Sequence, residues 1–267
     1  MRSRLSILGH LLLIILVRNT SVAQDLPMFE SLDLSSSSVK LSGSQNLSIM
    51  EFAGKHNEKL QAILKSNVAS SVAVFASPSL DSSREELTAL EEDVLESITD
   101  LYLENVTVGT KQLSLILNAK KINSLTFVNV SFKSGRFSLN MPVLSKLSLL
   151  EAKAPSTRAE FTIALKLPDA IPSLTLTDSF NCPEVTFENF KVKELTVIGN
   201  GNERSLSLQT VPKIDYEAIT FFRFNVEQIP RELLRKKLTL DRCILSPSFR
   251  FPRKTKVDMV FKNCISE

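Results

Sequence analysis

The residues of this chain that could carry out catalysis are few and scattered. Beyond residue 23 the only histidine is His56, and the three cysteines are Cys182, Cys243 and Cys264. Zinc sites and Ser-His-Asp triads need more such side chains than the chain can bring together. His56 stands in the polar stretch GKHNEK, and no G-x-x-x-x-G-K or G-x-G-x-x-G phosphate loop is present. We therefore predict no metal, no cofactor and no nucleophilic catalysis.

Carboxylates offer the remaining route to an enzyme, because two of them can act as acid and base on a polysaccharide. The candidates on predicted strands are Asp100, Glu104, Glu194, Asp241 and Asp258. They fall in different repeats without a paired spacing, which favours solvated surface charges. A polysaccharide-active β-helix enzyme that uses carboxylates is the alternative function.

The strongest pattern in the sequence is a pair of large apolar residues around one small or polar residue, repeated every 19–27 residues. Such alternation is typical of a short strand with one buried face, and a repeat of this length is typical of a solenoid. Stacked coils bury the apolar edge that one coil alone exposes. The pairs are Leu101/Leu103, Leu125/Phe127, Leu147/Leu149, Leu174/Leu176, Leu195/Val197, Ile219/Phe221, Leu238/Leu240 and Met259/Phe261.

A weaker strand signal lies between these pairs, so that we expect two short strands in each coil. The segments are 112–117, 136–141, 160–165, 184–189, 205–209 and 248–251.

The repeat resembles the leucine-rich repeat, whose pattern runs L-x-x-L-x-L-x-x-N/C-x-L. INSLTFVNV at 122–130 matches the leucine positions, LTVIGN at 195–200 matches the Asn variant, and LTLDRC at 238–243 matches the Cys variant. In the family the inward Asn binds the turn backbone. Here that position also holds Val106, Val130, Ala152, Ser179 and Phe224. The resemblance implies an irregular solenoid of short parallel strands. A right-handed parallel β-helix is the alternative fold.

The first 97 residues differ from the repeats. Residues 1–23 combine a basic start, an apolar run and small residues before a cleavage point, which indicates a secretory signal peptide. Residues 24–97 read as a Ser-rich segment and a helical cap, with helices at 48–66 and 83–97, a Ser83/Glu86 capping box and a buried strand at 70–77. Residues 98–267 form the solenoid. We expect a secreted, extracellular protein without a transmembrane segment.

Composition fits this class of protein. Of the 267 residues, 43% are hydrophobic and 23% charged, and the net charge of +3 is too small to indicate a nucleic-acid partner. The C-terminal stretch is locally basic, and Arg250, Arg253, Lys254 and Lys256 are candidates for contact with an anionic surface.

Two kinds of covalent modification are also predicted. Asn46, Asn105 and Asn129 lie in N-x-Ser/Thr sequons for N-glycosylation. A turn after Leu103 would expose Asn105 and Asn129 and stack them one coil apart. Cys243 and Cys264 occupy the same position in neighbouring coils. They form either a disulfide or a ladder of free thiols, and pairing through Cys182 is a further alternative.

The outward positions of the main strands hold mostly hydroxyl side chains, which suit a half-buried strand or line a binding surface. We expect a non-enzymatic scaffold that binds an extracellular protein or glycan, or that forms part of an extracellular coat. The outward residues are Tyr102, Thr126, Ser148, Thr175, Thr196, Thr220, Thr239 and Val260.

Overall fold

The structure is a computed structural model, which describes residues 38–40, 47–52, 61, 65, 70–76, 86–151, 161–166, 169–177, 185–199, 205–207, 211–250 and 258–266. The predicted signal peptide at 1–23, the sequon at Asn46, His56 and Cys182 lie outside these residues.

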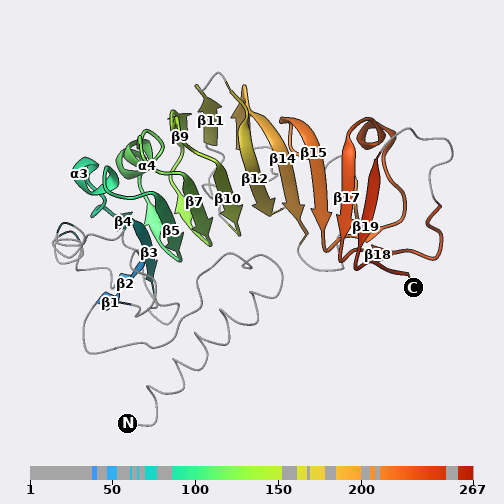
Figure 1. The fold of residues 1–267 in the computed structure, drawn as a ribbon, viewed down its shortest axis with the longest axis horizontal. Helices are drawn as coiled ribbons and strands as arrows, with labels where there is room; N and C mark the ends of the chain where they lie inside the picture. Colours follow the sequence, from blue (N-terminus) through green and yellow to red (C-terminus); the bar gives the residue numbers. More distant parts are fainter. Residues whose placement is uncertain are drawn as a thin grey trace, which may run out of the picture.

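One long sheet of 11 strands runs the length of the molecule (Figure 1). Neighbouring strands are parallel, except that β1 and β2 are antiparallel. In spatial order the strands are β1 (Ser38–Lys40), β2 (Leu47–Phe52), β3 (Ser71–Ala76), β5 (Asp100–Glu104), β7 (Ser124–Val128), β10 (Lys146–Leu150), β12 (Ile171–Thr177), β14 (Lys191–Ile198), β15 (Asp215–Phe222), β17 (Lys237–Asp241) and β19 (Met259–Lys262). Spatial order follows chain order, so the chain forms a solenoid, as the repeat predicts.

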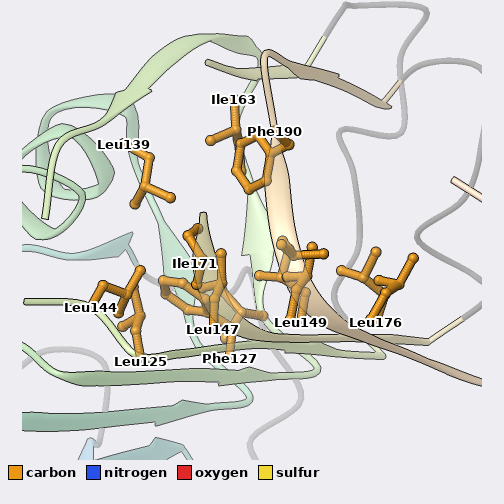
Figure 2. Close-up of a cluster of buried hydrophobic side chains, with 14 of the residues drawn as sticks. Leu125, Phe127, Leu139, Leu144, Leu147, Leu149, Ile163, Ile171, Leu176 and Phe190 are labelled. Carbon is orange, nitrogen blue, oxygen red and sulfur yellow. The ribbon is translucent and has the colours of Figure 1, made fainter. Parts of the chain in front are cut away.

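The predicted apolar pairs set the register of the long sheet. Leu125 lies beside Leu101 on one side and Leu147 on the other, and this row continues through every later strand. Members of the pairs from β5 to β17 are at most 2% exposed. Figure 2 shows several of them packed in one core with Ile163 and Phe190. Burial of this area, at about 25 cal/mol per Å², is the main force that stacks the coils.

Shorter sheets complete the coils on the other side. One joins β9 (Gly135–Leu139), β11 (Phe161–Leu165) and β13 (Val185–Glu188), a second joins β4 (Glu86–Leu87), β6 (Thr107–Val108) and β8 (Ser131–Phe132), and a third joins β16 (Asn225–Val226), β18 (Ile244–Leu245) and β20 (Ile265–Ser266). The predicted second strands at 136–141, 160–165 and 184–189 are therefore confirmed.

Other second strands were predicted wrongly. Residues 112–116 fall in helix α4 (Thr110–Ile116), and Leu117 is its C-cap; Gln112, Leu113 and Ile116 are buried at helical spacing. Residues 248–250 contain the end of a turn and no strand, and Ser205 makes an isolated bridge to Asn225; residues 208, 209 and 251 lie outside the described residues. In the last coils the second set of paired strands comes directly after the turn, as β16, β18 and β20. The chain can pair at this point because it is already in register with the preceding coil.

The turn after each main strand has a recurring left-handed residue, two positions after the second apolar residue. Asn105, Asn129, Arg223, Arg242 and Asn263 have φ between 48° and 60° there. The N–H of this residue donates to the next coil, as from Asn105 to the Val128 carbonyl and from Arg223 to the Asp241 carbonyl. The following residue turns inward, so Val106, Val130 and Phe224 are at most 1% exposed. Hydrogen bonds between coils thus satisfy the turn backbone, although an apolar residue rather than Asn occupies these inward positions.

In the described residues of the N-terminal region, two stretches predicted as helix form strands. Residues 47–52 form a strand rather than the start of a helix, and the long sheet therefore begins before residue 98. Among the described residues 86–97 only α3 (Glu92–Leu95) is helical, and Glu86 lies in β4 rather than in a capping box. The helical spacing at Leu87 and Leu90 is overridden because β4 pairs with β6, which buries both leucines completely. The strand predicted at 70–77 is confirmed as β3.

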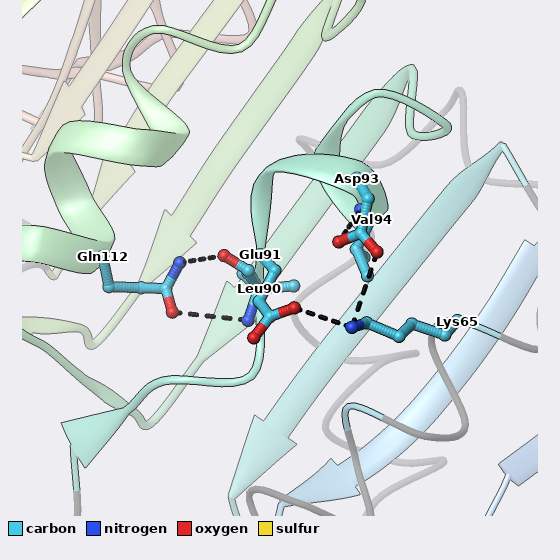
Figure 3. A network of polar contacts seen from close by, with 6 residues as sticks. All are labelled: Lys65, Leu90, Glu91, Asp93, Val94 and Gln112. Carbon is cyan, nitrogen blue, oxygen red and sulfur yellow. Dashed lines mark hydrogen bonds and ion pairs between the residues drawn. The ribbon is translucent and has the colours of Figure 1, made fainter.

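Gln112 of α4 fixes the segment between β4 and α3. Its side-chain amide donates to the Leu90 carbonyl at 2.5 Å and accepts from the Leu90 N–H at 3.3 Å (Figure 3). Gln112 is only 4% exposed, so it replaces water as the partner of both backbone groups. At the surface beside it, Lys65 pairs with Glu91 and Asp93.

The helices with stated bounds in the described residues are all short. They are α3, α4 and the 3-10 helix η3 (Arg231–Arg235). Within the described ranges, none is long and apolar enough to cross a membrane.

Candidate binding face

The outward-pointing hydroxyl residues of the long sheet form one straight row across eight strands, which we call the hydroxyl row. It consists of Tyr102, Thr126, Ser148, Thr175, Thr196, Thr220 and Thr239, and it ends at Val260. Ser148 and Thr175 are only 3% and 8% exposed, whereas Thr196, Thr220 and Thr239 are half-buried. Accessible hydroxyls are therefore concentrated towards the two ends of the row.

A second row of outward positions lies two residues after the hydroxyl row and is apolar in the middle. Val128 pairs with Leu150, and Thr177 leads through Ile198 to Phe222. Beyond Phe222 the row becomes charged, with Asp241 and then Lys262. On β14 and β15, partly accessible hydroxyls thus lie beside an apolar strip of Ile198 and Phe222, of which Phe222 is only 6% exposed.

Two arginines lie against the last aromatic ring of this strip. The Cζ atom of Arg223 is 5.1 Å from the centroid of the Phe222 ring, and that of Arg242 is 5.5 Å from it. Both arginines occupy the left-handed turn position in consecutive coils. The ring attracts the two cations and holds their planar guanidinium groups at one end of the strip. We call Phe222, Arg223 and Arg242 the arginine cluster.

The arginine cluster was missed in part by sequence reasoning. Arg242 belongs to the basic C-terminal stretch, but Arg223 lies outside it. Both can be identified from the repeat, because Arg223 and Arg242 each lie two residues after the second apolar residue of a pair, Phe221 and Leu240 respectively.

A scan of protein-family models, a search of curated proteins and a search of solved structures gave no match to this chain.

The candidate carboxylates are not brought together by the fold. Asp100 and Glu104 lie on β5, Glu194 lies on β14, and Asp241 lies on β17. Four strand spacings of about 4.8 Å separate β5 from β14. Asp100 accepts from Ser71 and Thr99, and Glu104 accepts from the Tyr102 hydroxyl at 2.7 Å. In the described part of the chain, no group of three or more His, Cys, Asp or Glu residues could hold a metal ion.

The two described sequon asparagines stack in neighbouring coils. The Asn129 Nδ2 atom donates to Asn105 Oδ1 at 2.6 Å, and both residues are half-buried rather than fully exposed. Val106 and Val130 point inward beside them, as the predicted turn requires. Glycosylation at Asn105 and Asn129 stays a prediction.

Cys243 and Cys264 are free thiols in the structure, so the ladder alternative describes them and no bridge joins them. The Cys243 Sγ atom donates to the Phe221 carbonyl at 3.5 Å, and Cys264 Sγ donates to the Leu240 carbonyl at 3.3 Å. Each thiol thus bonds to the backbone of the preceding coil. Burial raises the pKa of the Cys243 thiol from 9.0 to about 11, which keeps it protonated at neutral pH.

Of the predicted contacts to an anionic surface, Arg250 is exposed, and its Nη1 donates to the carbonyls of Pro247 and Phe249. Arg253, Lys254 and Lys256 lie outside the described residues.

Proposed function

We propose that this protein is a secreted, non-enzymatic binding scaffold of the leucine-rich-repeat type, and that its ligand is an anionic extracellular glycan. The observation that carries the proposal is the arginine cluster, which lies at the end of the apolar strip beside the in-register threonines Thr196, Thr220 and Thr239. Hydroxyls on one side and guanidinium groups on the other suit a sugar chain that carries carboxylate or sulfate groups.

The chemistry of the cluster supports an anion as the ligand. A guanidinium that lies near an aromatic ring keeps its N–H donors at the rim, where they can bind an oxyanion. Asp241 lies beside Phe222 and offsets part of the positive charge. The wider C-terminal region adds a favourable field, since residues 211–267 contain 12 of the 32 basic residues but only 7 of the 29 acidic ones.

The test is binding of the secreted chain to immobilised heparin, used as a sulfated probe, at several salt concentrations. Arg223→Asn/Arg242→Asn removes both cations but keeps a residue type that the chain itself uses at the left-handed position. Lys121→Asn/Lys193→Asn removes two exposed charges elsewhere and is the matched control.

We expect the arginine variant to bind about tenfold more weakly, a loss of about 1.4 kcal/mol, with a shallower salt dependence. The lysine variant should bind as the wild type does. Equal losses in the two variants would mean that net charge, not this face, governs binding. Capture of acidic proteins in preference to any glycan would make a protein the ligand.

A further inference from the structure

Among the described residues, β19 is the last strand of the long sheet. Among the described residues β19 pairs with β17 alone, and in the same coil β20 pairs with β18 alone. The carbonyl of Asp258 accepts from the N–H of Leu238 in β17, and that of Lys262 accepts from the N–H of Arg242, directly after β17. Because backbone groups alternate in direction along a parallel strand, those of Met259 point away from β17. This edge is therefore able to add another strand.

The end of the solenoid at β19 and β20 is also apolar. Ile265 of β20 is 65% exposed and is one of two exposed large apolar residues in the described part of the chain. Met259 and Cys264 are half-buried there, whereas their equivalents Leu238 and Cys243, one coil earlier, are almost completely buried. Exposed strand edges with apolar side chains pair readily with other strands.

The sequence of β19 is complementary to itself when two copies run antiparallel. With Val260 opposite Val260 of a second copy, Met259 lies opposite Phe261, and Asp258 lies opposite Lys262. Asp258 and Lys262 are both exposed on their own chain. This register fits the hydrogen-bonding pattern of antiparallel strands. The backbone groups of Val260 point towards β17, so the two Val260 residues form a non-hydrogen-bonded pair, and the flanking Met259 and Phe261 form hydrogen-bonded pairs.

The charges of the neighbouring strand extend this complementarity. Within one chain Lys237 precedes the paired Leu238, as Asp258 precedes Met259, and Asp241 pairs with Lys262. From β17 of one copy to β17 of the other, the charges follow one another as Lys237 and Asp258 of the first copy, then Lys262 and Asp241 of the second copy. Opposite charges thus alternate across four strands, and the symmetry repeats the same series in reverse.

We propose that two copies of this chain associate through β19, in an antiparallel and two-fold symmetric arrangement that joins their long sheets into one and covers the apolar end. This association is independent of the glycan-binding proposal, because the hydroxyl row from Thr196 to Thr239 and the arginine cluster remain on the outer face.

The test is sedimentation of the full secreted chain from about 1 µM to about 1 mM, a range in which weak specific association is visible. In the proposed dimer position 258 of one copy faces position 262 of the other. Asp258→Lys therefore places two lysines opposite each other, and Lys262→Asp places two aspartates opposite each other. Lys193→Glu changes an exposed charge on the central strand β14 and is the control.

We expect the wild type and the control to dimerise. Each single variant should still be monomeric at ten times the concentration at which the wild type dimerises. An equimolar mixture of the two single variants should form a heterodimer, as should the double exchange Asp258→Lys/Lys262→Asp with itself. Circular dichroism establishes that the variants are folded. A wild type that is monomeric throughout, single variants that dimerise normally, or a mixture that fails to associate would each overturn the proposal. Dimers that persist in the single variants would place the interface on another face.

Discussion

Single residues in this solenoid have their roles set by the coil on either side. Asn105 and Asn129 take the left-handed turn conformation and also bond to each other across two coils. Asn tolerates this region better than most residues, because its short amide can bond locally. Arg223 and Arg242 occupy the same conformation without that advantage, and their contact with Phe222 offsets part of the strain.

Substitution at Leu125 and Thr126 tests the register at the residue scale. Leu125 is 0% exposed, so Leu125→Asp places an unpaired charge between two coils. The expected loss of stability is several kcal/mol, enough to prevent secretion. Thr126→Asp should be tolerated, because Thr126 is half-buried on the outer face. Secretion yield and urea unfolding measure both. Similar losses in the two variants would show that the two faces are assigned wrongly.

The Cys243 thiol predicts a pH dependence of stability. Its folded-state pKa is raised from 9.0 to about 11 by burial, so the neutral thiol is favoured by folding. The corresponding stability is fully present below pH 9 and is lost as the pH rises towards 11. The shift corresponds to about 2 to 3 kcal/mol.

The measurement is the free energy of unfolding at pH 8 and pH 11 under reducing conditions, for the wild type and for Cys243→Ala. Between these two pH values the wild type should lose about 2 kcal/mol more than the variant. Parallel losses would indicate that Cys243 ionises freely in the folded protein.

At the scale of elements, side-chain hydrogen bonds decide where helices and strands end. The segment after β4 has helical spacing, but the Leu90 backbone bonds to the Gln112 side chain instead: Gln112 donates to the Leu90 carbonyl and accepts from the Leu90 N–H. Two hydrogen-bonding ladders, one on each side of the coil, are joined by short helices in the described residues.

Gln112→Ala should therefore destabilise this end of the solenoid. It leaves the buried N–H and C=O of Leu90 without their partner, at about 1–3 kcal/mol. We also expect faster hydrogen exchange at residues 89–98 than in the wild type. Ser114→Ala, at an exposed position of the same helix, is the control and should change neither value. Unchanged exchange in Gln112→Ala would mean that packing of Leu87 and Leu90 alone holds the segment.

At the scale of the whole molecule, each coil is stabilised by its neighbours, so position along the solenoid sets the effect of a substitution. Phe221 is completely buried between coils and packs against Phe224 with ring centroids 5.6 Å apart. Phe261 is the equivalent residue in the last coil and is only half-buried.

Phe221→Ala should thus cost about 3–5 kcal/mol, and Phe261→Ala less than half of that. Thermal unfolding at a concentration where the chain is monomeric gives both values. Equal costs would mean that the last coil is covered even in the monomer.

The sequence by itself determined the coil. The apolar pairs alternate with outward residues, and their spacing of 19–27 residues returns the chain to the same place, so the solenoid, its register and the turn at Asn105 and Asn129 follow from local pattern. These features depend on burial of an apolar face, which a short stretch of sequence encodes directly.

Only the tertiary structure decided how neighbouring coils use the remaining side chains. The strand at Glu86–Leu87, the helix at Thr110–Ile116 and the pair of arginines on Phe222 all depend on partners some 20 residues away. Their own sequences fit other conformations equally well: QLSLIL alternates like a strand, and the segment from Leu87 to Leu95 has the spacing of a helix. The choice falls to hydrogen bonds and contacts that exist only once the coils are stacked.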